Sequence, residues 1–369
     1  MYSITMKNVG FGDCFFIKNG DETLVVDCGT RAKPDSKYPQ LKNIANEIAC
    51  KAKENNYSAL ITHFHADHIS GFKKMEKENS KIFSKFYVPG IIKLGKKDFI
   101  IYKMGINIFF IYDLRNKKWD SSTAELKSFQ FVDKLAQEIV FLKAGDKFSI
   151  GNASYEVLWP DWRIIKYEEL LKLYDIMESV IKNELKDKYE DFYVIKESIL
   201  NSIDEWYQNN RGVVERMKEE LLRLSKLKYE CKKEREKIIE QIDEDEIHIS
   251  LNEAVNGTSI VFHDKKILML GDVLSSIIEI LSLKEYYDVV KIPHHGTASH
   301  YSSLLTKKCD TAFISTKKRD NYGNISESYV NHFLNCSLIV CTNGDENCEY
   351  KKNNNRCGVC RCESCTVYL

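Results

Sequence analysis

Short apolar runs that alternate with amphipathic stretches cover most of the first 160 residues. Apolar positions between Leu41 and Asn55 recur at helical spacing, and one strand-like run ends at Asp27 while another leads directly into His63. Runs typical of β-strands lie at 3–6, 14–17, 23–27, 58–62, 259–262, 267–270, 289–292 and 311–315. Strands that alternate with helices predict an α/β layered fold.

The hydrophobic pattern changes between residues 161 and 247. This stretch has one glycine, no proline, and 23 acidic against 17 basic residues, which gives a net charge of −6. Apolar residues recur at helical spacing, as in Leu170, Leu173 and Met177. The pattern predicts about three long helices inserted into the fold. Such helices pack an apolar stripe inward, or they form a lid or a partner-binding arm beside a site.

The predicted organisation has four parts. Residues 1–160 and 248–340 form the two halves of the layered fold, 161–247 form the helical insertion, and 341–369 form a Cys-rich tail.

Charge and composition narrow the class of protein. Lys+Arg equals Asp+Glu at 54 each, so a nonspecific cationic nucleic-acid binder is not expected. The amino terminus lacks a basic segment followed by an apolar run, and no stretch of about 18 apolar residues occurs. We therefore expect a cytoplasmic protein that does not associate with a membrane.

The strongest chemical signal follows the strand at 58–62. His63, His65, Asp67 and His68 are four potential metal ligands within six residues, and three of the nine histidines of the chain are among them. Imidazole and carboxylate groups suit zinc, manganese or iron. A strand end followed by a tight loop can direct these side chains at two neighbouring ions.

This motif resembles the His-x-His-x-Asp-His signature of the metallo-β-lactamase superfamily. The chain is similar in particular to the hydrolase domain of ComEC-type competence proteins, although it lacks their membrane channel. The resemblance implies a four-layer αββα sandwich, and it spans about residues 1–160 and 248–335. Besides the histidine motif, the segments that carry it are 8–14, 26–29, 256–261, 270–272 and 291–297.

The resemblance also implies a set of ligands for two divalent ions, zinc or manganese. It assigns His63, His65 and His295 to the first ion, Asp67 and His68 to the second, and Asp272 to both. Asp67, Asp272 and His295 are then the catalytic residues. Around them, Asp27 is expected to orient the metal loop, and His294 is expected to lie in an outer position or to contact substrate.

One position departs from the family pattern. Asn324 stands where the ComEC-type proteins have a histidine that would complete the second metal site. An amide oxygen is a weaker ligand for zinc than imidazole and suits harder ions. The resemblance therefore predicts a looser second site, on the side of Asp67 and His68, that prefers manganese or stays empty.

The ligand set implies a hydrolase that uses a metal-activated water. Family analogy favours phosphodiester bonds, in a nucleic acid or a nucleotide-like substrate. One alternative is hydrolysis of a small ester or lactone. Another is a catalytically weakened scaffold that recruits a protein partner through the helical insertion.

The tail is a second candidate metal site. Cys357, Cys360, Cys362 and Cys365 form two Cys-x-x-Cys pairs, and four thiolates can bind one structural zinc ion. The single residue between the pairs is short for a zinc ribbon. Disulfides, a redox role and free thiols therefore stay open as alternatives.

Overall fold

The chain forms two compact units. This computed structural model of the 369-residue chain describes residues 1–31, 41–90, 99–112, 124–161, 167–305, 308–315, 326–333, 338–342, 357–359 and 364–369. The sandwich unit comprises Met1–Pro89, Lys134–Asp161 and Asn256–Leu369, and the helical unit comprises Gly90–Asp133 and Trp162–Val255. Residues 90–133 thus lie in the helical unit, whereas the sequence pattern placed them in the first half of the layered fold.

Two β-sheets form the sandwich unit. Their strands are β1 (Tyr2–Lys7), β2 (Phe15–Asn19), β3 (Glu22–Val26), β4 (Asn56–Leu60), β5 (Phe83–Pro89), β6 (Ala136–Leu142), β7 (Lys147–Ile150), β8 (Ala153–Trp159), β9 (Val261–His263), β10 (Ile267–Met269), β11 (Tyr286–Lys291), β12 (Lys308–Ile314), β13 (Leu338–Cys341), β14 (Cys357–Val359) and β15 (Ser364–Tyr368). The first sheet has the order β15-β1-β2-β3-β4-β5-β6, and the second has the order β14-β13-β12-β11-β10-β9-β8-β7. β3 to β6 run parallel to one another, as do β10 to β14, and the other neighbours are antiparallel.

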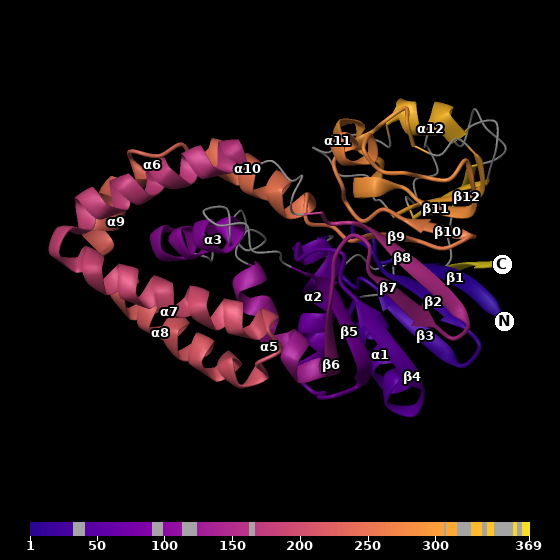
Figure 1. Cartoon of the computed structure of the whole chain (residues 1–369), viewed down its shortest axis with the longest axis horizontal. Helices are drawn as coiled ribbons and strands as arrows, with labels where there is room; N and C mark the ends of the chain where they lie inside the picture. Colours follow the sequence, from indigo (N-terminus) through magenta and orange to yellow (C-terminus); the bar gives the residue numbers. More distant parts are fainter. Residues whose placement is uncertain are drawn as a thin grey trace. The chain divides into compact units, whose positions relative to one another are not determined.

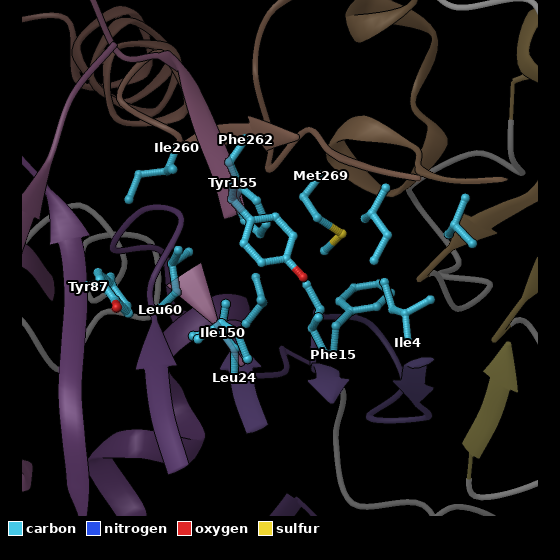
Figure 2. Close-up of a cluster of buried hydrophobic side chains, with 14 of the residues drawn as sticks. Ile4, Phe15, Leu24, Leu60, Tyr87, Ile150, Tyr155, Ile260, Phe262 and Met269 are labelled. Atoms are coloured by element: carbon cyan, nitrogen blue, oxygen red, sulfur yellow. The ribbon is translucent and has the colours of Figure 1, made fainter. Parts of the chain in front are cut away.

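Apolar side chains from both sheets meet between them. Ile4, Phe15 and Leu24 extend from the first sheet, and Phe262 and Met269 extend from the second (Figure 2). All five are buried. Each such side chain stabilises the fold by about 1.5–3 kcal/mol relative to its exposed state. The two sheets therefore stack face to face around one hydrophobic core.

Helices cover the outer faces of the sheets. α1 (Leu41–Glu54) buries Leu41, Ile44 and Ile48 at helical spacing and contacts β4 and α2 (Ala66–Met75). On the second sheet, α12 (Glu327–Phe333) contacts β12, and a short helix, α11 (Ser275–Ile278), lies nearby (Figure 1). These layers confirm the predicted α/β sandwich.

Each sheet takes one of its two edge strands from the carboxyl-terminal region. β15 pairs antiparallel with β1, which places Cys365 opposite Met6, and β14 pairs parallel with β13, which places Cys357 opposite Ile339. Cys360 and Cys362 lie outside the described residues. The described parts of the tail are thus strands of the sandwich, and the four-cysteine zinc site stays a prediction.

The helical unit is built around an apolar helix. α3 (Ile100–Ile111) buries eleven of its twelve residues and contacts α6, α7, α8 and α9. No helix in the described ranges has both the length and the apolar character needed to cross a lipid bilayer. The other helices are α5 (Ala124–Leu135), α6 (Glu168–Leu185), α7 (Tyr189–Tyr207), α8 (Val214–Glu230), α9 (Lys232–Ile239) and α10 (Glu244–Asn256).

One cluster of polar side chains around the buried Lys196 and Asn107 joins three helices of this unit. The ammonium group of Lys196 on α7 donates to the Asn107 side-chain oxygen on α3 (2.9 Å), to the Tyr174 hydroxyl on α6 (2.9 Å), and to Glu178 on α6. Glu178 also accepts a hydrogen bond from the Tyr189 hydroxyl at 2.9 Å. We call these five residues the helical polar cluster.

Candidate metal centre

The predicted ligands follow the carboxyl ends of strands in both sheets. Asp27 comes directly after β3, and His63 follows the end of β4 by three residues. In the second sheet, Asp272 follows β10 and His295 follows β11. β3 and β4 are parallel, as are β10 and β11, so within each sheet these ends lie at one edge.

The backbone is tightly packed where these loops approach one another. His294 and His295 both have positive φ angles, 44° and 57°. Each such residue costs about 1–3 kcal/mol, and residues of this kind cluster at functional sites.

At Gly29, an added Cβ would lie 2.5 Å from the backbone of Asp67 and His68 at the start of α2. Only glycine fits there, because any side chain would displace the metal-motif loop.

Two histidines of the 63–68 motif, His63 and His68, converge on the carboxylate of Asp272, and His65 lies beside His63. Nε2 of His63 lies 3.1 Å from Nδ1 of His65, and Nε2 of His68 lies 3.1 Å from Oδ2 of Asp272. Nε2 of His63 is 3.9 Å from the same oxygen of Asp272. The structure thus places Asp272, which follows β10, beside the motif that follows β4.

His295 joins a second group of potential ligands. Its Nε2 lies 3.3 Å from Oδ2 of Asp67 and 3.8 Å from Oδ2 of Asp272. Potential ligand atoms of Asp67, His68 and His295 all lie within 4.8 Å of one another. The family pattern assigned His295 to the other ion. The loop after β11 brings the ring nearer to Asp67 than to Asp272, and the ion that His295 would hold stays a prediction.

Hydrogen bonds from outside the cluster orient two of the rings. Nδ1 of His68 lies 2.8 Å from Oδ2 of Asp27, and Asp27 also accepts bonds from the Thr62 amide (2.8 Å) and hydroxyl (2.7 Å). Nδ1 of His295 donates to the Ser315 carbonyl oxygen at 2.6 Å. In each ring Nε2 is therefore the atom directed into the cluster. Asp27 orients the loop in the manner that was expected for it.

Burial controls the charge of the two leading histidines. Burial lowers the pKa of His63 well below its usual range, with a further contribution from His68 nearby. Burial also lowers the pKa of His65 to about 3. Both rings are therefore neutral at pH 7, which is the protonation state that binds metals.

The carboxylates of the cluster are ionised. Burial by itself raises the pKa of Asp67 and of Asp272, but neighbouring cationic groups outweigh it. The Arg31 guanidinium holds the pKa of Asp67 well below its usual range, and His68 and Lys291 do the same for Asp272. Asp67 and Asp272 are therefore anionic beside the neutral His63 and His65 at neutral pH. Burial by itself lowers the pKa of His68 and of His295, but Asp272 and neighbouring carboxylates outweigh it and raise both.

The cluster suits a cation. Nε2 of His65 is buried and has no hydrogen-bond partner among the residues that the structure describes. The separations of 3.1 to 3.9 Å between cluster atoms bracket the spacing of about 3.4 Å between ligands in a tetrahedral shell with metal–nitrogen bonds of about 2.1 Å. Two buried carboxylates beside bare imidazole nitrogens are a typical donor set for divalent zinc or manganese.

Three charged residues lie at the site although the sequence pattern did not select them as ligands. They are Lys291, Arg31 and Asp13. Lys291, at the end of β11, forms ion pairs with Asp13 (2.6 Å) and Asp272 (3.3 Å). Nε of Arg31 lies 3.3 Å from Oδ1 of Asp67. Asp13 lies in the segment 8–14, in which the sequence pattern predicted no ligand. A lysine inside an otherwise apolar strand was the available signal for Lys291, since buried lysines are nearly always paired.

His294 lies beside the cluster and reaches solvent. Its side chain is 27% exposed, and its Nε2 is 3.9 Å from Oδ2 of Asp272. Its Nδ1 lies 2.8 Å from Nδ1 of His300. Asn324 lies outside the described residues, so its predicted part in the second site stays a prediction.

The first half of the sandwich unit matches a known family. Residues 8–81 match the family model described as the metallo-beta-lactamase superfamily, and this segment contains Asp13, Asp27 and the 63–68 motif. No sequence among the curated proteins matches the chain. The family match covers residues 8–81 alone, and the two-sheet fold is consistent with it. The nearer resemblance to ComEC-type proteins stays a prediction.

Several solved structures are similar to the chain. A diphosphatase from the PhnP family aligns over 100% of this chain and 98% of its own length, at 8% identity and a TM-score of 0.41. The metallo-beta-lactamase GOB-18 from Elizabethkingia meningoseptica aligns over 41% of this chain and 47% of its own, at 17% identity and a TM-score of 0.23. The metallo-beta-lactamase fold protein YhfI from Bacillus subtilis aligns over 42% and 52%, at 12% identity and a TM-score of 0.24. The chain thus spans about half the length of the last two.

Proposed function

We propose that this protein is a metal-dependent hydrolase that cleaves phosphodiester bonds. The observation that supports the proposal most is the buried convergence of His63, His68 and His295, from loops of both sheets, on Oδ2 of Asp272. Proteins with the metallo-β-lactamase fold are generally hydrolases and usually bind divalent metals.

We assign the candidate ligands to two groups with Asp272 between them, and His68 also lies within 4.8 Å of His63 and Asp272. His63 and His65 would hold one divalent ion with Asp272. The remaining group, Asp67, His68 and His295, would hold the other. Ions bound there would supply a nucleophile from water and neutralise negative charge on the substrate. We propose zinc or manganese as these ions.

The chain's own side chains orient this machinery. Asp67 is held on both sides, with Oδ1 beside Arg31 (3.3 Å) and Oδ2 beside His295 (3.3 Å). Burial lowers the pKa of His294 to about 4, so its partly exposed ring is neutral at pH 7. A neutral imidazole can donate or accept a hydrogen bond. We assign His294 to contact with substrate.

Arg31 favours an anionic substrate over a neutral ester or lactone. Its side chain is 30% exposed while it lies against the buried Asp67. A guanidinium group binds phosphate oxygens in a planar, bidentate manner and keeps its charge at all relevant pH values. A cationic group that borders the catalytic carboxylate and also reaches solvent is suited to a phosphodiester.

Metal-stripped protein resupplied with Zn²⁺ or Mn²⁺ tests the proposal. The substrates are an aryl phosphodiester, an uncharged aryl ester, a lactone, and single- and double-stranded DNA and RNA. We expect metal-dependent cleavage of the phosphodiester and a preference for it over the uncharged ester. Cleavage of the uncharged substrates alone, or no cleavage with either ion, would contradict the proposal.

A matched pair of arginine variants tests the role of Arg31. We expect Arg31→Gln to raise KM for the phosphodiester by about 10-fold, which is the loss of about 1.4 kcal/mol of binding, with a smaller change for the ester. Arg216→Gln is the control, because Arg216 forms an ion pair with Glu205 in the helical unit. Equal effects of Arg31→Gln on both substrates would show that Arg31 acts on Asp67 alone.

A further inference from the structure

A buried lysine lies behind the carboxylate that both proposed metal groups share. Lys291 is 1% exposed and stands at the end of β11, after Val289 and Val290. Lysine is almost never fully buried unless it is paired. Its position therefore needs an explanation that apolar packing does not provide.

The ammonium group of Lys291 has three oxygen neighbours. Nζ lies 2.6 Å from Oδ2 of Asp13, 2.7 Å from the Gly271 carbonyl oxygen, and 3.3 Å from Oδ1 of Asp272. An ammonium group has three hydrogens to donate. The three neighbours therefore account for its whole hydrogen-bonding capacity and leave none for a substrate.

The two oxygens of Asp272 have different surroundings. Oδ1 accepts from Lys291 and from the backbone amide of His294 (3.1 Å). Oδ2 faces Nε2 of His68 (3.1 Å) and Nε2 of His63 (3.9 Å). One oxygen is therefore bound by protein donors, while the other is directed at the proposed metal positions.

Asp13 balances the charge of the lysine. Its contact with Lys291, at 2.6 Å, is shorter than the contact between Lys291 and Asp272, at 3.3 Å. The backbone of Asp13 is fixed on both sides, since its amide donates to the Asp67 carbonyl oxygen and its carbonyl accepts from the Gly29 amide, each at 3.0 Å. Asp13 can thus hold Lys291 in place and neutralise it, so that Asp272 keeps its negative charge for the cations.

We propose that Lys291 is a positioning residue that, anchored by Asp13, occupies Oδ1 of Asp272 and restricts this carboxylate to one metal-facing oxygen. The proposal rests on the proposed function, because it concerns the same metal centre. Lys291 itself touches neither substrate nor metal. Its effect is to make Asp272 a single-oxygen bridge between the two groups of ligands.

Cobalt binding tests this role without any substrate. Metal-stripped wild type, Lys291→Met and Lys291→Arg are titrated with Co²⁺, whose visible absorption reports the number of ligands. Lys291→Met removes the cationic partner of Oδ1 and leaves it only the His294 amide, so the carboxylate is less firmly held. We therefore expect a changed cobalt spectrum and a 10- to 100-fold weaker affinity for one of the two equivalents, as is typical when an outer partner of a ligand is lost. Lys291→Arg keeps a cationic donor and should retain the wild-type spectrum in part.

Two further variants separate positioning from loss of structure. Lys196→Met is the matched control, because Lys196 is also 1% exposed and paired with a carboxylate, but it lies in the helical unit. It should leave the cobalt spectrum unchanged. The double variant Asp13→Asn/Lys291→Met removes both charges, which avoids leaving a single buried charge. If Lys291→Met alone does not fold, the cobalt spectrum and affinity of the double variant replace those of the single variant.

Kinetics provide the second measurement. At saturating metal, Lys291→Met should lower kcat for the aryl phosphodiester by about 10- to 100-fold with KM nearly unchanged. A folded Lys291→Met, or the double variant in its place, with wild-type cobalt spectrum, affinity and kcat would overturn the inference while leaving the proposed function intact. Wild-type protein that binds no divalent ion would overturn both.

Discussion

Both units bury a cluster of charged and polar side chains, and the two clusters differ in how their hydrogen bonds are completed. In the helical polar cluster, the Lys196 ammonium meets three acceptors, and Glu178 accepts from Lys196 and Tyr189. Donors face acceptors throughout. Such a cluster joins α3, α6 and α7 and requires no further atom.

The metal-centre cluster has the opposite character. Nε2 of His63 faces Nδ1 of His65 at 3.1 Å, while the other nitrogen of His65 has no hydrogen-bond partner among the described residues. Asp67 and Asp272 add two ionised carboxylates to the same space. Buried polar groups are normally satisfied within the protein. A buried ring nitrogen without a partner, beside two ionised carboxylates, is therefore the feature that points to a ligand, and burial of charge alone does not.

The largest expected effect comes from breaking the metal-centre cluster. His65→Ala and Asp272→Ala should each lower kcat/KM for the aryl phosphodiester by about three decades or more, since each removes a ligand of an activating ion. Steady-state kinetics measure the loss, and circular dichroism checks that the fold persists. His248→Ala, in α10 of the helical unit, is the control. Wild-type turnover by either folded variant would refute the dinuclear mechanism.

Added Zn²⁺ or Mn²⁺ should stabilise the protein by binding to the metal-centre cluster. At a free metal concentration of about 100 Kd, binding adds about 2.7 kcal/mol to the free energy of unfolding. Thermal unfolding of the stripped protein with and without Zn²⁺ or Mn²⁺ measures this gain. His65→Ala should lose most of it and Glu178→Gln should keep it. An equal gain in both variants would place the bound metal elsewhere.

Breaking the helical polar cluster should cost stability without affecting metal. Glu178→Gln removes the charge that compensates the buried Lys196, and we expect a loss of about 1.5–3 kcal/mol in the free energy of unfolding. Glu219→Gln, at an exposed position of α8, should change it by less than about 0.5 kcal/mol. Urea denaturation measures both. A change in cobalt affinity in Glu178→Gln would show that the two clusters are coupled.

The carboxylate of Glu178 should make the free energy of unfolding depend on pH. Burial by itself raises the pKa of Glu178, but the Lys196 ammonium outweighs it and holds the pKa below the ordinary value of 4.5. A depressed folded-state pKa stabilises the fold fully above about pH 4.5, and this contribution is lost as pH falls through the folded-state value. Wild type should therefore lose its stability advantage over Glu178→Gln below pH 4.5. A constant difference between pH 7 and pH 3 would contradict the assignment.

The smallest change is expected at the metal centre, in the affinity for the second ion after Asn324→His. Because His295 lies with Asp67 and His68, we expect Asn324→His to change the affinity of the second ion by less than about 10-fold, or 1.4 kcal/mol. His295→Ala should remove that ion. Titration of the stripped protein with Mn²⁺ measures both. A large gain from Asn324→His would restore the family-based expectation that position 324 limits the second site.

Much of the sandwich unit could be predicted from the sequence because its signals are local. Apolar runs at 23–27 and 58–62 correspond to β3 and β4, and helical spacing from Leu41 corresponds to α1. The placement of 90–133 could not be predicted in this way. α3 is apolar on all sides, and such a helix gives no directional stripe that tells which unit will bury it.

By itself, the sequence determined the cluster of ligands from His63 to His68. A strand end and the first turn of a helix place those side chains together whatever the rest of the chain does. Only the tertiary structure decided which partners complete them. His295 meets Asp67 across 228 residues of chain, and Lys291 meets Asp13 from the opposite sheet. Contacts of that kind leave no periodic trace in the sequence, because packing the two sheets against each other creates them.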